Sequence, residues 1–421
     1  MSSDEYWIWL QSALKPGARV DELIAEFGDA QGVYQATENQ LKISGTVTPA
    51  QLEKISETPI SCVQPIIKEC LKKGWQIVTP DSEYYPKRFR QLKDFPLVLY
   101  VNGDLEILKS NICISIVGTR QASRYGLEVT RRLSAQLVSA GAVVVSGGAL
   151  GVDSASHIGA IMGKGKTVAY LGCGLSSNYL MENAALRKSI SENGAVVSEF
   201  PPMEAPTRRS FPIRNRLISG MSLGTIVIEA GEKSGSLITA RFALEQGRDV
   251  FAVPGNIISS AYTGANKLIR EGAKPVFSAA DVLEEYINLY PDEILLEKAD
   301  EEIINFGSAS ADKSLEIKTK PKTIAKKATT EKLQQKAVKA VEKSEQTSEP
   351  KARQKQPVPV GVSEVARKIY ELFGEGEVHI DEIADMVSLD VSEVLSAVTE
   401  LELFGVIRAT NGRRYTLDYK E

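Results

Sequence analysis

Arginine, glycine and hydroxyl-bearing residues cluster along this 421-residue chain in a pattern that suits the binding of phosphate groups. Residues 231–236 are rich in glycine and serine, and they precede a segment with helical spacing, 236–247. Free backbone N–H groups and the positive end of a helix dipole favour a phosphate at such a place. Just upstream, Arg214 and Arg216 lie among apolar residues, where a guanidinium group needs an anionic partner. This stretch therefore predicts an anion site.

Small and hydroxyl residues also follow other short apolar segments. Segments 112–117, 142–145 and 166–171 are apolar and too short for helices, so they predict buried parallel strands. In an open α/β sheet, the carboxyl ends of such strands share one edge, and ligands bind there where the strand order reverses. We therefore expect one anion site at that edge, next to Arg120. The turns that we expect to meet there are Gly118, Ser146-Gly147-Gly148, Gly172, Gly174 and Ser234-Gly235-Ser236.

The elements that must position these residues alternate between strand and helix patterns from 111 to 290. Segments 225–229 and 249–253 flank the helix 236–247, which makes a strand–helix–strand unit. Repeated units of this kind predict an α/β fold with a doubly wound parallel, extended Rossmann-like sheet. The domain is expected to span 59–290, because short extended segments broken by prolines lead into it.

Further parts flank this core on both sides. Residues 1–58 predict a helical module whose apolar–glycine turns resemble helix-hairpin-helix (or SAM-like) modules; it either packs on its neighbour or binds DNA backbone. Residues 291–358 predict a disordered basic linker, with 13 basic and 6 acidic residues between positions 312 and 357. Residues 359–421 predict three helices and a hairpin, an arrangement similar to a winged-helix domain. Its third helix is acidic, so a contact with another protein is at least as good an interpretation of this domain's role as recognition of DNA.

Composition argues against several classes of protein. A net charge of −4 gives no global nucleic-acid signature, so DNA binding must come from local patches. Neither a membrane span nor a signal peptide is recognisable. Four cysteines without a Cys-x-x-Cys pair and two distant histidines predict no metal, and we expect no cofactor. Asp153 and His157, four residues apart, predict a helix N-cap and a packed histidine rather than two metal ligands.

Two classes of enzyme are alternatives to a binding function. A nicotinamide dehydrogenase requires Gly-x-Gly-x-x-Gly after its first strand, and residues 118–126 read GTRQASRYG instead. The lonely-guy/lysine-decarboxylase-like nucleotide N-ribohydrolases are similar in fold and remain the alternative function. They carry Pro-Gly-Gly-x-Gly-Thr and a catalytic Glu, whereas residues 231–236 read GEKSGS. Glu199 and Glu229 end strands, and a carboxylate that accepts bonds from loop amides is the better interpretation of each.

The core from about 85 to 287 resembles the DNA-processing protein A family, also called DprA or Smf. The resemblance is carried by Ile116-Val117-Gly118-Thr119-Arg120, Ser123-x-Tyr125-Gly126, Ser146-Gly147-Gly148-Ala149-x-Gly151-Val152-Asp153, Phe211-Pro212-x-Arg214-Asn215-Arg216, Ser234-Gly235-Ser236-Leu237-Ile238-Thr239-Ala240 and Val253-Pro254-Gly255. It implies a cytoplasmic, non-enzymatic protein that binds single-stranded DNA, forms homodimers and loads RecA during natural transformation.

The resemblance also selects residues of the site. The basic pocket of the family matches Arg120 and the segment before Phe211, where Arg208 replaces the usual lysine and keeps the charge. A base would stack on Phe211. The expected DNA-binding residues are Gly118, Thr119, Arg120, Ser123, Ser146, Gly147, Gly148, Arg208, Phe211, Arg214, Asn215, Arg216, Ser234, Gly235 and Ser236.

Two of these arginines have an alternative role. Arg214 and Arg216 stand close in sequence to a predicted strand, and either would find a carboxylate partner in Glu199 or Glu229 beneath the site. Arg120 and Arg208 lie in loops, so they are the safer candidates for contacts with DNA.

Overall fold

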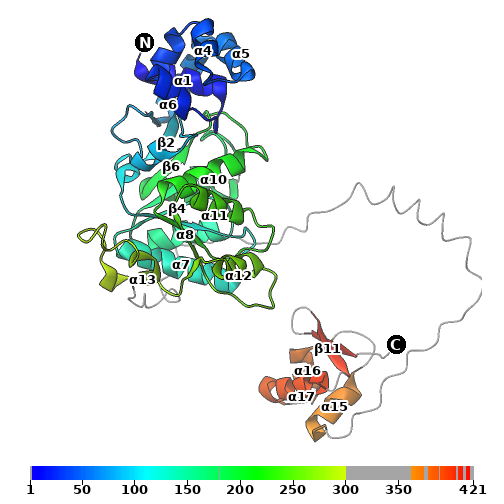
Figure 1. Cartoon of the computed structure of the whole chain (residues 1–421). Coiled ribbons are helices and arrows are strands. Elements are labelled where there is room, and N and C mark those ends of the chain that lie inside the picture. The colour runs from blue at the N-terminus through cyan, green and yellow to red at the C-terminus, as the bar shows by residue number, and fades with distance from the viewer. Residues whose placement is uncertain are drawn as a thin grey trace, which may run out of the picture. The chain divides into compact units, whose positions relative to one another are not determined.

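The computed structural model describes residues 2–179, 181–299, 362–373, 378–387, 389–403, 406–410 and 414–417. The chain divides into two compact units, Met1–Thr319 and Lys320–Glu421, and each is described by itself (Figure 1). Most of the predicted basic linker, residues 300–358, lies outside the described residues. None of the described helices combines the length and apolar character that crossing a membrane requires.

The larger unit opens with a group of short helices. They are α1 (Ser3–Leu14), α2 (Asp21–Phe27), α3 (Ala30–Gln35), α4 (Glu38–Ser44), α5 (Pro49–Glu57) and α6 (Val63–Lys73). Local sequence fixes where two of them begin, because Thr37 and Thr48 form capping boxes with Gln40 and Gln51. The helical group thus continues to Lys73, beyond the boundary expected at residue 58.

These helices pack on the edge of the sheet. The side chains of Trp7, Ile8 and Leu10 on α1 share one apolar cluster with Val98 and Tyr100. Polar bonds support the same contact, since Gln11 Nε2 donates to the Val98 carbonyl at 3.1 Å and the Tyr100 hydroxyl to Gln11 Oε1 at 3.1 Å. This is the packing role that the sequence left open for the N-terminal residues.

A nine-stranded sheet forms the centre of the larger unit, in the order β1-β2-β6-β5-β4-β3-β7-β8-β9. The strands are β1 (Gln76–Val78), β2 (Leu99–Gly103), β3 (Cys113–Val117), β4 (Val143–Ser146), β5 (Thr167–Leu171), β6 (Gly194–Ser198), β7 (Gly224–Val227), β8 (Asp249–Ala252) and β9 (Lys274–Pro275). Strands β3 to β9 pair in parallel, while β2 pairs antiparallel with both β6 and β1. The strand order reverses between β3 and β7, so the carboxyl ends of these two strands mark the switch point.

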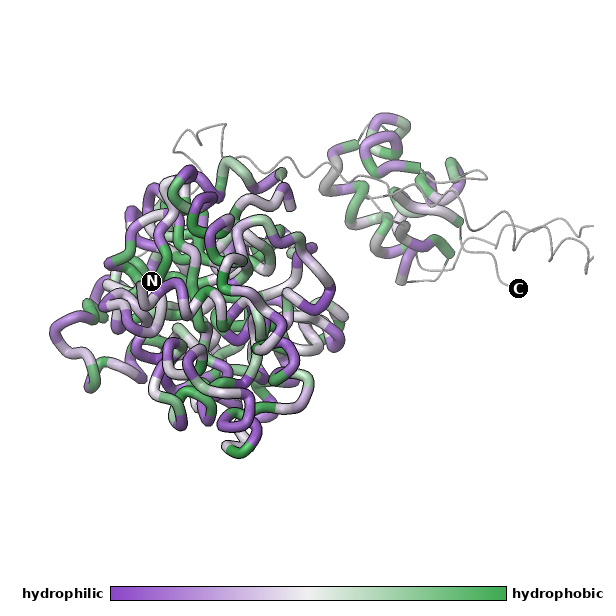
Figure 2. The backbone as a smooth tube through the Cα atoms, turned by 90° about the horizontal axis from the view of Figure 1, so that it is seen from above, coloured by the Kyte–Doolittle hydropathy of each residue, from purple (hydrophilic) through white to green (hydrophobic). Residues whose placement is uncertain are grey.

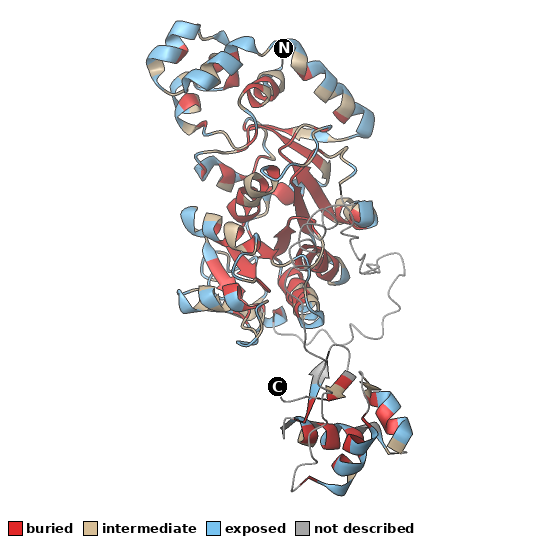
Figure 3. Ribbon diagram, turned by 90° about the vertical axis from the view of Figure 1, so that its right-hand side faces the viewer, coloured by how far each residue is buried: buried red, intermediate tan, exposed pale blue. Residues whose placement is uncertain are grey.

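Helices cover both faces of this sheet, which explains why its central parallel strands, β3 to β7, are mostly apolar. On β3, Ile114 and Ile116 pack into a cluster with α7, α8 and α13, while Cys113 and Val117 pack into another with α10, α11 and α12. The central strands are accordingly buried (Figure 3), and hydrophobic stretches run through the interior (Figure 2). The doubly wound fold predicted from the sequence is confirmed. The helices are α7 (Arg124–Ser139), α8 (Val152–Met162), α9 (Ala184–Glu192), α10 (Ser210–Met221), α11 (Ser236–Glu245), α12 (Thr263–Arg270) and α13 (Ala280–Leu283).

Short 3₁₀ helices complete the larger unit. They are η1 (Ile60–Cys62), η2 (Lys87–Gln91), η3 (Glu106–Lys109), η4 (Met181–Asn183) and η5 (Leu296–Lys298). Of these, η2 and η3 lie in the proline-broken segment that was expected to lead into the sheet, and that segment supplies the antiparallel strands β1 and β2.

The smaller unit has the winged-helix architecture that the sequence predicts. Its elements are α15 (Glu364–Leu372), β10 (Val378–His379), α16 (Ile380–Val387), α17 (Val391–Leu403), β11 (Ile407–Thr410) and β12 (Arg414–Leu417). The three strands form a sheet in the order β10-β12-β11. On the acidic helix α17, the Glu400 carboxylate accepts bonds from the Ser363 N–H and hydroxyl at 2.8 and 2.6 Å. One acidic side chain of this helix is therefore used to hold the start of α15.

Candidate nucleic-acid interface

The loop that follows β3, residues 118–123, lies at the switch point and is tied to the end of β7 by Glu229. The Thr119 N–H donates to the Glu229 carbonyl at 2.7 Å, and the Ser123 N–H donates to the Glu229 carboxylate at 2.9 Å. Glu229 is 1% exposed. A Cβ at Gly126 would stand 2.1 Å from the same carboxylate, so only glycine fits there without a shift. The interpretation of Glu229 as a carboxylate that holds loop amides is confirmed.

One end of this loop carries an arginine over an aromatic pair. The Arg120 side chain is exposed, its guanidinium carbon lies 5.2 Å from the centre of the Phe211 ring, and Nη1 lies 3.4 Å from the Tyr179 hydroxyl. The rings of Tyr179 and Phe211 are 5.3 Å apart and tilted by 50°. The loop after β3, the loop after β5 and the start of α10 thus bring a cation and two rings together. The sequence predicted Arg120 and Phe211 but did not select Tyr179, which stands in an irregular segment remote from both.

Exposed arginines also precede α10. Arg208 and Arg209 are exposed and form no ion pair with any residue in the described part of the chain. The next residue, Ser210, is buried and donates to the Gly172 carbonyl at 2.6 Å, which fixes the start of the helix against the turn after β5. This turn is close to Phe211, since a Cβ at Gly172 would lie 2.9 Å from that ring. Arg208 is thus placed where a phosphate has access, and Arg209, which no sequence motif indicated, shares that exposure.

Arg216 is an internal group and does not reach the surface. It is 2% exposed, and its Nη2 lies 2.6 and 2.7 Å from the two carboxylate oxygens of Glu199, with Nε 3.3 Å from Asp94. Burial raises the pKa of Glu199, and the charge of Arg216 acts in the opposite direction. The structure therefore argues against the expected phosphate contact of Arg216 and for the alternative pairing with Glu199.

Arg214 is buried as well, at 4% exposure. Its Nη1 donates to the carbonyl groups of Gly147 and Tyr170, and Asp153 lies beside it as a charge partner. A Cβ at Gly147 would meet this guanidinium at 2.2 Å, which explains the glycine without any ligand. Neither Arg214 nor Gly147 is available for the phosphate contact that the sequence suggested, because the guanidinium is already satisfied inside the fold.

The turn after β4 is likewise internal. The buried Ser146 hydroxyl donates to the Ile116 carbonyl at 2.7 Å and joins β4 to β3. Gly148 is buried and has a φ of 65°, a backbone conformation that favours glycine, and its carbonyl accepts a bond from Asn183. Ser146 and Gly148 were expected to line the DNA site. They are buried instead, and their hydrogen bonds stabilise the edge of the sheet from the interior.

The loop before α11 remains open to a ligand. Gly235 is exposed, and a Cβ there would meet no atom within 4 Å. The hydroxyls of Ser234 and Ser236 lie 2.8 Å apart, and Ser236 is buried at the first position of the helix. Asn215, on α10, reaches the Gly235 carbonyl at 3.5 Å. The accessible part of the predicted set therefore consists of Gly118, Thr119, Arg120, Ser123, Arg208, Phe211, Asn215, Ser234 and Gly235.

The Asp153–His157 pair on α8 is structural. The helix begins at Val152, so Asp153 lies in its first turn rather than at the predicted N-cap, and its carboxylate accepts a bond from the Ala149 N–H at 3.3 Å. His157 is fully buried with Nδ1 2.7 Å from the Thr167 hydroxyl, which confirms the packed histidine. Among the described residues, no group of three or more potential ligands is placed to hold a metal ion.

Burial also predicts how His157 responds to acid. Burial lowers the pKa of His157 to about 3, whereas an unfolded histidine titrates near 6.5. The unfolded chain therefore takes up a proton first, and stability falls as pH drops from about 6.5 towards about 3, by up to about 1.4 kcal/mol per pH unit. We expect His157→Gln to be less stable at pH 7 but to lose less between pH 7 and pH 4, as measured by urea unfolding. Equal losses in both proteins would contradict a histidine held neutral.

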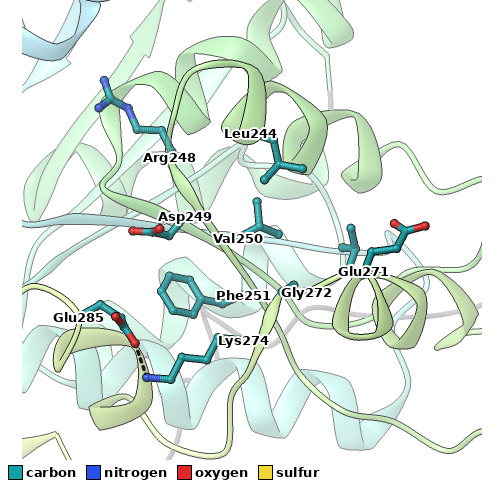
Figure 4. Close-up of a pocket in the computed structure, with 11 residues that line it drawn as sticks. Leu244, Arg248, Asp249, Val250, Phe251, Glu271, Gly272, Lys274 and Glu285 are labelled. Carbon is teal, nitrogen blue, oxygen red and sulfur yellow. Dashed lines mark hydrogen bonds and ion pairs between the residues drawn. The ribbon is translucent and has the colours of Figure 1, made fainter.

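A cavity of about 370 Å³ lies away from this site, around the amino end of β8 (Figure 4). Several of its charged groups already have partners: Lys274 bonds to Glu284 and Glu285, the Tyr286 hydroxyl donates to Asp249 at 2.7 Å, and Arg248 Nη2 donates to Gln91 Oε1 at 2.7 Å. The amino ends of the strands are opposite to the edge that holds Arg120, so this cavity is not part of the candidate interface.

Comparison with known proteins agrees with these features. The family model described as DNA recombination-mediator protein A matches residues 76–287, and a model for the DprA winged helix domain matches residues 349–413. DNA processing protein DprA of Bacillus subtilis is 42% identical over 214 residues, which are 51% of this chain and 72% of that protein. Protein Smf of Synechocystis is 31% identical over 359 residues, covering 83% of this chain and 82% of that protein. The X-ray structure of DprA from Streptococcus pneumoniae aligns with a TM-score of 0.59 and 33% identity, over 68% of this chain and 98% of that chain.

Proposed function

Because this chain belongs to the DprA/Smf family of DNA processing proteins, we propose that it binds single-stranded DNA at the carboxyl edge of its sheet during natural transformation. The observation that carries the proposal is the exposed Arg120 stacked over Phe211 at the switch point. A cation beside an aromatic ring is the combination with which single-strand binders hold a backbone and a base.

The surroundings of Arg120 support a ligand that is recognised by its backbone. Arg208 and Arg209 are exposed cations, and the open loop at Gly235 offers backbone groups at a helix start. Contacts of these kinds fix phosphates and carry no sequence information. Aromatic stacking on Phe211 is tolerant of base identity. The site should therefore bind single strands with weak sequence preference.

The proposal is a binding function and not an enzymatic one. The N-ribohydrolase alternative needs a carboxylate that is free to act on a nucleotide. Glu229, the carboxylate just after β7 that is a candidate for this role, is 1% exposed and accepts a bond from the Ser123 N–H. It is thus engaged in holding the loop, which favours the binding function over catalysis.

The proposal extends to partners and location. The description of the family as a recombination mediator supports transfer of the bound strand to a recombinase, RecA, in the cytoplasm. A homodimer would place two strand sites in one assembly and raise the effective affinity for a long strand. The winged-helix unit, whose helix α17 is acidic, is better suited to a protein contact than to a DNA groove.

We expect the full chain to shift a single-stranded oligonucleotide at lower concentration than its duplex, and to release no base from nucleoside monophosphates. If Arg120, Arg208 and Arg209 each neutralise a phosphate, the logarithm of affinity should fall with that of salt at a slope of about −2. Gel shift over a salt series and a base-release assay measure the two properties. Equal affinity for both DNA forms would contradict the proposal, and turnover that Glu229→Gln abolishes would favour the N-ribohydrolase.

A further inference from the structure

The other end of the loop 118–123 leads to a second aromatic pair. Tyr125, in the first turn of α7, is 53% exposed, and its ring lies 6.2 Å from that of Tyr262 at an interplanar angle of 66°. Tyr262 immediately precedes α12 and is 6% exposed. An exposed ring thus stands against a buried one, at the same edge of the sheet as Phe211.

The buried ring is held rigidly. The Tyr262 hydroxyl lies 3.2 Å from the Ser123 hydroxyl, and Ser123 in turn accepts a bond from the Gly126 N–H at 3.0 Å. A Cβ at Gly255 would overlap the Tyr262 ring at 1.9 Å, so the ring packs directly on that backbone. Tyr262 therefore forms a fixed support, and Tyr125 presents the accessible surface.

One short loop connects the two aromatic pairs. Arg120 lies on Phe211 at its beginning, and Ser123 contacts Tyr262 at its end, while Glu229 accepts bonds from the Thr119 and Ser123 N–H groups. Tyr125 lies five positions after Arg120, which limits the distance between their Cα atoms to about 18 Å. This distance is short enough for one extended strand to reach both.

The charge near Tyr125 also suits a strand of DNA. Arg124 is exposed and forms no ion pair with the described residues, so a cation stands beside the second ring as Arg120 stands beside the first. Glu128, on the next turn of α7, lies 3.9 Å from Arg131. Each of the two rings, Phe211 and Tyr125, is thus adjacent to an arginine that is available for phosphate.

We propose that Tyr125, supported by Tyr262, is a second base-stacking platform, which takes an unpaired base of the same DNA strand that places another base on Phe211. The inference rests on the proposed function and extends it from one base position to two. The strand runs along the loop 118–123, with its phosphates between Arg120 and Arg124. A single strand too short to reach both rings occupies the Phe211 end alone.

The test compares Tyr125→Ala and Phe211→Ala in the full chain, with deoxythymidine oligonucleotides of about two nucleotides, too short to reach both rings, and of about twelve nucleotides, within the usual length of single-strand binding sites. Loss of one stacked base should weaken binding of the longer strand by about 5- to 150-fold in Tyr125→Ala. The shorter strand should bind this variant nearly as it binds the wild type, whereas Phe211→Ala should bind both poorly. The salt slope of Tyr125→Ala should be unchanged, because no phosphate contact is lost.

Two controls make the result specific. Tyr34 is an exposed tyrosine whose ring lies edge-on to buried Trp9 in the N-terminal helices, so Tyr34→Ala removes an equivalent ring far from the proposed strand. Tyr125→Phe keeps the ring and should bind like the wild type. Photo-crosslinking with iododeoxyuridine in the longer strand should label Tyr125.

The outcomes separate this inference from the function on which it rests. If Tyr125→Ala binds the longer strand like the wild type while Phe211→Ala is impaired, the second platform is refuted and the strand-binding function stands. If the wild type does not prefer single strands at all, the proposed function fails. A weakened Tyr125→Ala matched by an equal loss in Tyr34→Ala would indicate a general effect on the protein and would also refute the platform.

Discussion

Replacing Arg120 and Arg208 together by alanine should lower the affinity for single-stranded DNA on the order of 100-fold or more. Each exposed guanidinium is expected to make one charge-assisted contact with a phosphate, worth about 1.5–3 kcal/mol. Two lost phosphate contacts should also make the log–log salt slope shallower by about 1.4. Fluorescence anisotropy over a salt series measures both quantities. The melting temperature should stay unchanged, since neither side chain supports the core.

A matched double variant separates the site from the net charge. Arg132 and Lys166 are exposed cations, on α7 and at the amino end of β5, and Arg132→Ala/Lys166→Ala removes the same two charges away from the switch point. Its affinity and slope should remain close to those of the wild type. An unchanged affinity in the Arg120/Arg208 variant, or an equal loss in both, would place the strand elsewhere, with the basic segment 312–357 as the first candidate.

The accessible part of the site could be predicted because it depends on local features of the chain. Arg120 follows a short apolar strand, and a residue in that position lies in a loop at the carboxyl edge of a parallel sheet. Gly235 precedes a helix whose spacing is visible in the sequence. Strand ends and helix starts are set by a few neighbouring residues, so the edge of the sheet that carries the ligand follows from the order of the elements.

The internal part of the site could not be predicted in the same way. Arg214 and Arg216 lie on α10, and the sequence does not show that the packing of that helix turns both guanidinium groups inward. Arg216 meets Glu199 because the end of β6 lies beneath the helix, a contact that depends on the tertiary fold. Gly147 shows the same limit: it resembles a phosphate-loop glycine, but its missing Cβ makes room for Arg214.

Contacts between distant loops could not be predicted from the sequence either. Tyr179 stands in an irregular segment after β5, and only the sheet order brings it to Phe211 and Arg120. Tyr262 reaches Ser123 for the same reason. Aromatic residues in loops carry no periodic signal that would indicate a partner, so both pairs emerge only from the folded chain.

Arg216→Ala should destabilise the larger unit by about 3–5 kcal/mol, because it leaves the buried Glu199 carboxylate without its partner. All three tryptophans, at positions 7, 9 and 75, belong to that unit, so their fluorescence during urea unfolding reports on it alone. The loss should shrink at lower pH. Burial raises the pKa of Glu199, and a carboxyl whose folded pKa exceeds its unfolded one costs stability as pH rises through that interval.

The companion variant Glu199→Leu/Arg216→Met replaces the ion pair by apolar side chains and should recover most of the stability, since a buried pair contributes little beyond the cost of its own burial. Under conditions in which it is folded, this double variant should bind single-stranded DNA with the salt slope of the wild type. The Arg120/Arg208 variant should not. A slope made shallower by about 0.7 in a protein that unfolds like the wild type would show that Arg216 contacts a phosphate after all. Normal stability of Arg216→Ala would likewise contradict the structural role, because a buried guanidinium whose Nη2 contacts both oxygens of a buried carboxylate cannot be removed from it at no cost.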